Sequence, residues 1–500
     1  MLRRKKVKPI TLRDVTIIDD AKLRKAITAA SLGNAMEWFD FGVYGFVAYA
    51  LGKVFFPGAD PSLQMIAALG TFSVPFLIRP LGGLFFGMLG DKYGRQKILA
   101  ITIVIMSIST FCIGLIPSYA TIGIWAPILL LICKMAQGFS VGGEYTGASI
   151  FVAEYSPDRK RGFMGSWLDF GSIAGFVMGA GVVVLISTVV GEENFLDWGW
   201  RIPFFLALPL GIIGLYLRHA LEETPAFQQH VEKLEQGDRE GLQDGPKVSF
   251  KEIATKHWRS LLTCIGLVIS TNVTYYMLLT YMPSYLSHNL HYSEDHGVLI
   301  IIAIMVGMLF VQPIMGLLSD RFGRRPFVIG GSIALLFLAV PCFMLINSHA
   351  TGLIFCGLLL LAVILNAFTG VMASSLPAMF PTHIRYSALA SAFNISVLIA
   401  GLTPTAAAWL VETTGDLYMP GYYLMVVAIV GLATGIFMKE TANKPLRGAT
   451  PAASDLSEAK EILREHHDNI EHKIEDINAQ IAELEAKRAN LIQQHPRINE

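Results

Sequence analysis

Charged residues and cysteines are both scarce in this chain. Asp, Glu, Lys and Arg make up 16% of its 500 residues and hydrophobic residues 53%, whereas a soluble protein carries about 25% charged residues. The formal net charge is zero, so the basic surface that binds nucleic acid is not indicated. The five cysteines have no C-x-x-C spacing and no histidine cluster nearby. We therefore expect neither disulfides nor a metal site.

Signals for nucleotide binding and for secretion are also missing. No G-x-x-x-x-G-K-[ST] sequence occurs, so we expect no ATP-driven chemistry, no cofactor and no enzymatic activity. The N-terminus, MLRRKKVKPITLRD, has no cleavable secretory pattern, so we expect the first apolar helix to remain as a membrane anchor. Any energy-requiring work by such a chain would have to draw on an ion gradient.

Apolar runs of about twenty residues, by contrast, recur along most of the chain and are long enough to cross a bilayer as helices. One set of the loops between them carries Lys and Arg, and the alternate set carries acids and neither base. This asymmetry places the basic loops, both termini and the 221–257 loop on the cytoplasmic side of the membrane, which we expect to be a bacterial inner membrane. We predict an all-α membrane protein with spans at 27–56, 64–89, 98–117, 122–152, 162–190, 200–220, 258–286, 297–319, 326–347, 351–380, 385–411 and 419–438.

The two halves repeat. GMLGDKYGRQK (87–97) recurs as GLLSDRFGRRP (316–326), which indicates one six-helix unit used twice around a central path. In each loop a first glycine permits close helix packing, a second permits a tight turn, and the aspartate can pair with arginine or with a helix N-terminus. A purely topogenic loop would explain the arginines but not the repeated Asp and Gly. We assign gating to Gly87, Asp91, Gly94, Arg95, Gly316, Asp320, Gly323 and Arg324.

These loops resemble the signature loop of the major facilitator superfamily. GNAMEWFDFGVYGF (33–46), KMAQGFSVGGEYTGA (134–148), WGWRIPF (198–204) and LEETPAF (221–227) further resemble the metabolite–proton symporter family, and the resemblance covers essentially all of 20–440. It implies a major facilitator fold and proton symport. With its basic N-terminus and long helical tail, the chain resembles the osmosensory members. These import zwitterionic compatible solutes such as proline, glycine betaine or ectoine and respond to osmotic stress.

The predicted organisation has six parts. The polar tail repeats an apolar residue every seven positions from Leu463 to Leu491, which indicates a coiled coil; a lone amphipathic helix docked elsewhere is the alternative. Arg488 takes a position in the coiled-coil seam that otherwise holds isoleucine, so we expect it to determine the relative orientation of the two helices. We predict an antiparallel homodimer. Another protein is the alternative partner. The parts are a basic N-terminus (1–26), six-helix bundles (27–220 and 258–439), a cytoplasmic central loop (221–257), a flexible linker (440–458) and the coiled coil (459–495).

Ionisable residues inside apolar helices are costly and are functional by default. They fall in the first half of the chain and have no mid-span counterpart in the second. A buried carboxylate holds a proton readily, and a cationic neighbour moderates this. Structural ion pairing with Arg79 or Lys134 is the alternative role. We assign proton coupling to Glu37, Asp40, Glu144 and Asp169.

A zwitterion needs a cation for its carboxylate and aromatic faces for its ammonium group. Aromatic residues in membrane helices more often serve packing, so these assignments stay predictions. Besides the solute, protons and anionic lipid are the expected partners. Two alternatives remain: a metabolite anion such as a dicarboxylate, which needs more than one unpaired cation, and a non-transporting sensor or scaffold. The predicted substrate site contains Asn34, Trp38, Tyr44, Arg79, Lys134, Gln137, Trp167, Asn272, Tyr275 and Tyr276.

Overall fold

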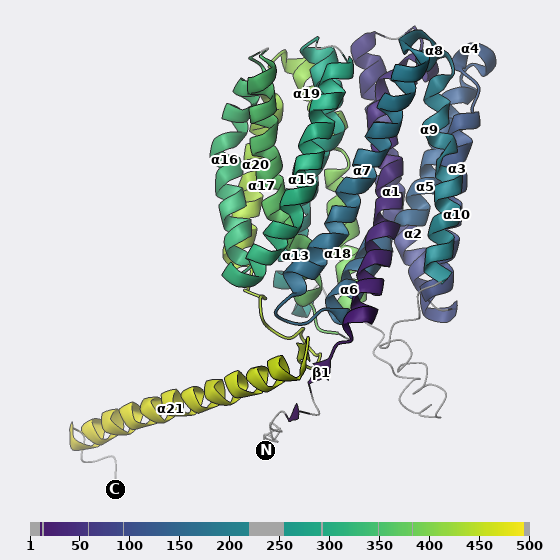
Figure 1. Ribbon diagram of the computed structural model, residues 1–500. Helices are drawn as coiled ribbons and strands as arrows, with labels where there is room; N and C mark the ends of the chain where they lie inside the picture. The colour runs from purple at the N-terminus through teal and green to yellow at the C-terminus, as the bar shows by residue number, and fades with distance from the viewer. Residues whose placement is uncertain are drawn as a thin grey trace.

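The protein is a bundle of long helices, with the N-terminal segment and the last helix both at one end (Figure 1). We call this end of the bundle the termini end. The predicted central loop lies mostly outside the described residues. The computed structural model describes residues 11–12, 15–58, 60–93, 95–219, 255–291, 294–348, 350–382 and 384–494.

Each predicted span coincides with one helix or with a run of consecutive helical segments. In the described chain, ten helical stretches are long and apolar enough to cross a membrane. The first and third predicted spans fall on α1 and on α3, whose apolar part is Ala100–Leu115. The first half comprises α1 (Asp20–Phe55), α2 (Pro61–Tyr93), α3 (Arg95–Leu115), α4 (Tyr119–Ile122), α5 (Trp125–Val141), α6 (Glu144–Tyr155), α7 (Arg161–Val190), α8 (Glu192–Asp197), η2 (Gly199–Arg201), α9 (Ile202–Phe205) and α10 (Ala207–His219).

The second half repeats the pattern. Its first span changes from α-helix to π-helix at Tyr276, and π-helical turns are frequent at functional sites. Its elements are α13 (Trp258–Tyr275), η4 (Tyr276–Tyr281), α14 (Met282–Ser284), η5 (Tyr285–Asn289), α15 (Glu294–Phe322), α16 (Arg325–Ile346), α17 (Thr351–Ala378), α18 (Arg385–Ala400), α19 (Thr403–Thr414) and α20 (Met419–Phe437).

Glycines let the helices of the core approach closely. A Cβ added at Gly138 would collide with the carbonyl oxygen of Pro75, so the glycine lets α5 pack against α2. At the boundary between the halves, a Cβ at Gly316 would lie 2.5 Å from Ser166 Oγ. There α7 packs along α15 and α17, and α2 packs on α18 and α19. The two halves therefore meet along most of their length.

The prediction of a flexible linker at 440–458 is wrong over most of its length. Leu446 is buried against Ala153 and Ala378, and β2 (Ala452–Ala453) pairs in parallel with β1 (Thr16–Ile17). The polar composition of this segment gave no sign that it packs on the bundle. Its partners include buried arginines that are far away in the sequence. The tail helix α21 (Leu456–Gln494) begins before the predicted residue 459 and extends away from the bundle (Figure 1).

Candidate functional site

Glu37 of α1 and Arg79 of α2 form an ion pair inside the first half. The Arg79 Nη2 atom donates to Glu37 Oε1 at 3.0 Å, and both residues are buried. The guanidinium carbon lies 5.9 Å from the ring centroid of Phe393, on α18 of the other half. Removing one partner of a buried pair leaves a costly lone charge. A proton arriving at Glu37 would therefore change what Arg79 binds.

A second buried chain of polar groups links α1, α3 and α5. Thr110 Oγ1 donates to Asp40 Oδ2 at 2.7 Å, and Gln137 Nε2 donates to Thr110 Oγ1 at 2.9 Å. Lys134 Nζ donates to Gln137 Oε1 at 2.9 Å and sits 3.8 Å from the centroid of the Tyr44 ring. Our prediction did not include Thr110, although a threonine inside an apolar helix was a usable signal.

Asp169 on α7 is held by Tyr145, another residue that the prediction missed. The Tyr145 hydroxyl donates to Asp169 Oδ1 at 3.0 Å. Its ring stacks on Phe393, with centroids 5.0 Å apart and planes at 17°. Phe393 of the second half thus touches both Arg79 and Tyr145. Glu144 is buried and begins α6.

Trp38 lies at the centre of an aromatic cluster that bridges the halves. Its ring centroid is 5.0 Å from that of Tyr275 and 6.1 Å from that of Tyr276. The Trp38 indole N–H donates to Asn34 Oδ1 at 3.2 Å, and Asn34 Nδ2 donates to the Leu168 carbonyl on α7 at 2.8 Å. Asn34 therefore orients Trp38 and anchors α1 to α7. Tyr276 is itself buried on η4.

Four buried polar atoms of α13 and η4 have no hydrogen-bond partner in the described part of the chain. They are Asn272 Nδ2 and the hydroxyl oxygens of Tyr275, Thr280 and Tyr281. Buried polar groups in native proteins are nearly always paired, so such a group of them is the kind of surface that a polar ligand satisfies. No three His, Cys, Asp or Glu side chains of the described residues come close enough to hold a metal ion.

Trp167 lies apart from the other aromatic residues of the predicted substrate site. Its ring packs on a cluster built around Leu23 and Ile27, towards the start of α1. Trp167 and Asp169 are two positions apart on one helix, so their side chains leave opposite faces of α7. Only the Asp169 face points at Tyr145.

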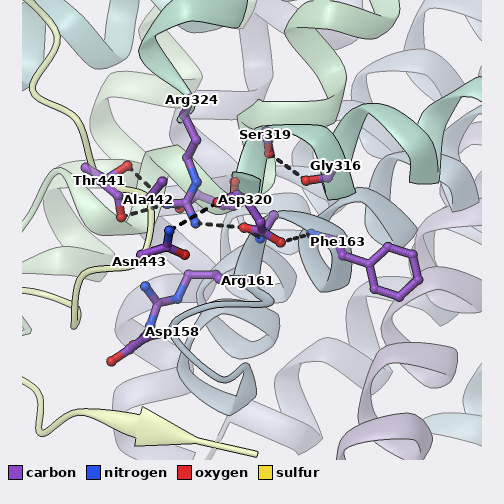
Figure 2. A network of polar contacts seen from close by, with 12 residues as sticks. Asp158, Arg161, Phe163, Gly316, Ser319, Asp320, Arg324, Thr441, Ala442 and Asn443 are labelled. Atoms are coloured by element: carbon purple, nitrogen blue, oxygen red, sulfur yellow. Dashed lines mark hydrogen bonds and ion pairs between the residues drawn. The ribbon is translucent and has the colours of Figure 1, made fainter. Parts of the chain in front are cut away.

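The repeated loop of the second half lies at the termini end, where it bonds to the first half (Figure 2). Asp320 Oδ1 accepts from the Gly162 amide at 2.7 Å, and Oδ2 accepts from the Phe163 amide at 2.8 Å. These amides belong to the first turn of α7, where a negative charge is favoured. Gly323 has a φ of 93°, which permits the turn into α16.

The equivalent loop of the first half is described less fully. Gly94 lies outside the described residues, and the side chains of Asp91 and Arg95 and the surroundings of Gly87 are not described. In the second-half loop, Arg324 Nη1 donates to the Ser374 carbonyl of α17 at 3.1 Å. The contacts of the repeated loop are thus described for the second half only.

Comparisons with known proteins agree with this arrangement. A family model described as sugar (and other) transporter matches residues 25–452, and one described as osmosensory transporter coiled coil matches residues 454–499. Among solved structures, the proton:xylose symporter XylE bound to 6-bromo-6-deoxy-D-glucose aligns with a TM-score of 0.68. That alignment covers 89% of this chain and 99% of XylE at 18% identity, so it supports the fold and nothing beyond the fold.

Three curated relatives extend over nearly the whole chain. The proline/betaine transporter of Salmonella typhimurium is 88% identical over 500 residues, covering 100% of both chains. The glycine betaine/proline/ectoine/pipecolic acid transporter OusA of Dickeya dadantii is 85% identical over 499 residues, again covering 100% of both. The ectoine/proline transporter ProP of Corynebacterium glutamicum is 40% identical over 461 residues, 91% of this chain and 92% of its own.

Proposed function

The chain belongs to the sugar (and other) transporter family of the major facilitator superfamily, and from that premise we propose that it imports a small zwitterionic compatible solute together with a proton. The solute class is taken from relatives named for proline, betaine and ectoine. The tail match to an osmosensory coiled coil supports activation by osmotic stress.

The main support for the proposal is that a buried cation, Arg79, and an aromatic cluster both lie at the boundary of the halves. Arg79 supplies a charge-assisted donor for the solute carboxylate. Trp38, Tyr275 and Tyr276 supply ring faces for its ammonium group. The Asn272 amide, which has no partner in the described part of the chain, lies on the same helix as Tyr275 and adds a further donor.

The Glu37–Arg79 pair then offers a coupling step. A proton on Glu37 neutralises the carboxylate and weakens its hold on Arg79, which becomes available to the solute carboxylate. When solute and proton leave on the other side, Glu37 and Arg79 pair again and the carrier resets. Asp40 and Asp169, held by Thr110 and Tyr145, and the buried Glu144 are the other acids that can take the proton.

The energetics suffice for accumulation. One proton entering across ~150 mV releases about 3.5 kcal/mol, which supports roughly several-hundred-fold accumulation of a neutral zwitterion. A metabolite dianion would need further cations. Of the two cations in the predicted site, Arg79 is already paired with the Glu37 carboxylate, which favours the zwitterion over a dianion.

The orientation follows from charge. We place the termini end in the cytoplasm, because the basic loops lie there and the alternate loops contain acids without Lys or Arg. In a bacterial inner membrane, those loops would meet anionic lipid headgroups. On α21 the apolar residues Ile474, Ile477, Ile481 and Leu484 are exposed, which fits pairing with a second copy.

Uptake into proteoliposomes with an imposed pH gradient tests the proposal. We expect radiolabelled proline and glycine betaine to accumulate when the outside is acidic, and succinate not to accumulate. An uncoupler should abolish the gradient-driven part. Succinate uptake without proline uptake would instead support the anion carrier, and no uptake of either at any osmolality would support the non-transporting scaffold.

A further inference from the structure

The segment after α20, residues 440–453, crosses the termini end of the bundle in contact with both halves (Figure 2). We call it the strap. Its first part is bound to the second half. The Glu440 carboxylate accepts from the backbone amides of Arg324 and Arg325, each at 3.0 Å, and so caps α16. Burial opposes ionisation of Glu440, but these amide bonds outweigh it and hold its pKa below the ordinary value.

The last part of the strap is bound to the first half. The Asp158 amide donates to the Ala452 carbonyl at 2.9 Å, and the Ala452 amide donates to Asp158 Oδ2 at 3.1 Å. Next to it, β2 pairs with β1, which leads directly into α1. Arg159 forms ion pairs with Glu461 and Glu465 at the start of α21. The base of the tail helix is therefore attached to the first half, although its chain comes from the second.

Three buried arginines depend on the strap. Arg324 donates to the Thr441 carbonyl at 3.3 Å, Arg161 to the Lys444 carbonyl at 2.9 Å, and Arg385 to the Arg447 carbonyl at 2.9 Å. Each arginine is at most 1% exposed. A buried cation that loses its partners is costly. Arg324 and Arg385 therefore hold the strap on the second half, and its bond to Arg161 of the first half stabilises the closed arrangement of this end.

Two contacts join residues 440–447 of the strap to the first half. Arg161 of the first half reaches Lys444, and Leu446 packs on Ala153 of α6 as well as on Ala378 of α17. Directly after them Gly448 has a φ of 80°, a conformation that a side chain would strain. When the halves part at this end, the strap must give up its contacts to one half, and Gly448 is the point at which it can bend.

We infer that the strap is a latch: it holds the termini end closed, and opening requires Lys444 and Leu446 to leave the first half while residues 440–447 stay on the second. Because the base of α21 is anchored to the first half, any pairing of the tail that moves this base acts on the latch directly. The inference rests on the proposed transport cycle only in requiring that the termini end opens.

A matched pair of disulfides tests the direction of release. In a chain whose five cysteines have been replaced, Leu446→Cys combined with Ala153→Cys ties the strap to the first half. Leu446→Cys combined with Ala378→Cys ties it to the second. Oxidation of the first pair should abolish solute uptake, reversibly by reductant, whereas oxidation of the second should leave uptake within about twofold. Equal effects of both disulfides would overturn the inference.

An accessibility measurement tests the latch without any solute. Ser166→Cys places a thiol at the buried contact between α7 and Gly316. Leu446→Ala should raise the labelling rate of this thiol by a water-soluble maleimide about threefold or more, because the open state becomes more populated. Leu456→Ala, at an exposed position of α21, is the control. Unchanged labelling in Leu446→Ala would overturn the latch whatever the transported solute is.

Discussion

Glu154 on α6 and Arg385 on α18 form a 2.7 Å ion pair that joins the two halves at the termini end. Arg385 Nε also donates to the Pro377 carbonyl at 3.0 Å, so its position within the second half does not depend on Glu154. Since the pair crosses the boundary, it must break whenever the halves separate there.

Glu154→Gln is expected to weaken closure without unfolding the protein. The neutral amide removes the charge across the boundary and leaves the carbonyl bonds of Arg385 in place. The Glu154 side chain is 25% exposed, so we expect about 1 kcal/mol or less and a modest rise in maleimide labelling of Ser166→Cys. Glu192→Gln, on an exposed helix of the first half, should leave labelling unchanged.

Glu37→Gln and Glu144→Gln should each abolish proton-driven accumulation while the protein still inserts. Both acids are buried in the first half, and a glutamine cannot carry the proton. Counterflow of solute at equal concentrations should survive, because it needs no net proton movement. Glu412→Gln, at an exposed position of α19, is the control. Normal accumulation by both mutants at every pH would refute the coupling assignment.

Asp320→Asn should favour opening of the termini end. The carboxylate accepts two amides of α7, whereas an asparagine offers one oxygen and no charge, a loss of about 1 kcal/mol. Cysteine accessibility before and after the change would show it, with Asp416→Asn in a loop of the second half as control. From the repeat we predict a more severe effect for Asp91→Asn; if neither mutant changes labelling, the gating role is wrong.

Asn272→Ala should weaken solute binding without weakening the fold. Its amide nitrogen has no partner among the described residues, so deleting it removes no internal hydrogen bond. A lost bond to the solute is worth about 1 kcal/mol, or roughly a fivefold higher KM. Asn366→Ala is the matched control, since Asn366 donates to the Met308 carbonyl at 3.1 Å and should lose thermal stability instead. The reverse pattern would remove Asn272 from the substrate site.

Arg488→Ile should strengthen tail pairing and shift it towards parallel strands. In an antiparallel pair, Arg488 can approach Glu475 of the other copy, whereas parallel strands would bring two Arg488 side chains together. Cysteines placed at either end of α21 in the full-length protein report orientation by which disulfides form. Transport should persist with altered osmotic dependence. Head-to-head disulfides in the unmutated chain, or none at all, would contradict an antiparallel homodimer.

The sequence by itself determined the number and order of the spans, the repeat and the type of fold. Those features depend on local composition: apolar length, loop charge and a recurring loop motif. Asp320 illustrates how far this reaches, because the sequence predicted an aspartate able to meet an arginine or a helix N-terminus, and it lies at the start of α7.

Only the tertiary structure decided which groups meet. Tyr145 and Thr110 hold Asp169 and Asp40 from other helices, and Trp167 packs towards the start of α1 although it is only two residues from Asp169. The largest difference between the prediction and the structure is the strap. Its polar sequence resembles a flexible linker, yet its carbonyls bond buried arginines at three distant positions. Every residue has the same backbone carbonyl, so the side chains of residues 440–453 could not predict hydrogen bonds between their carbonyls and these arginines.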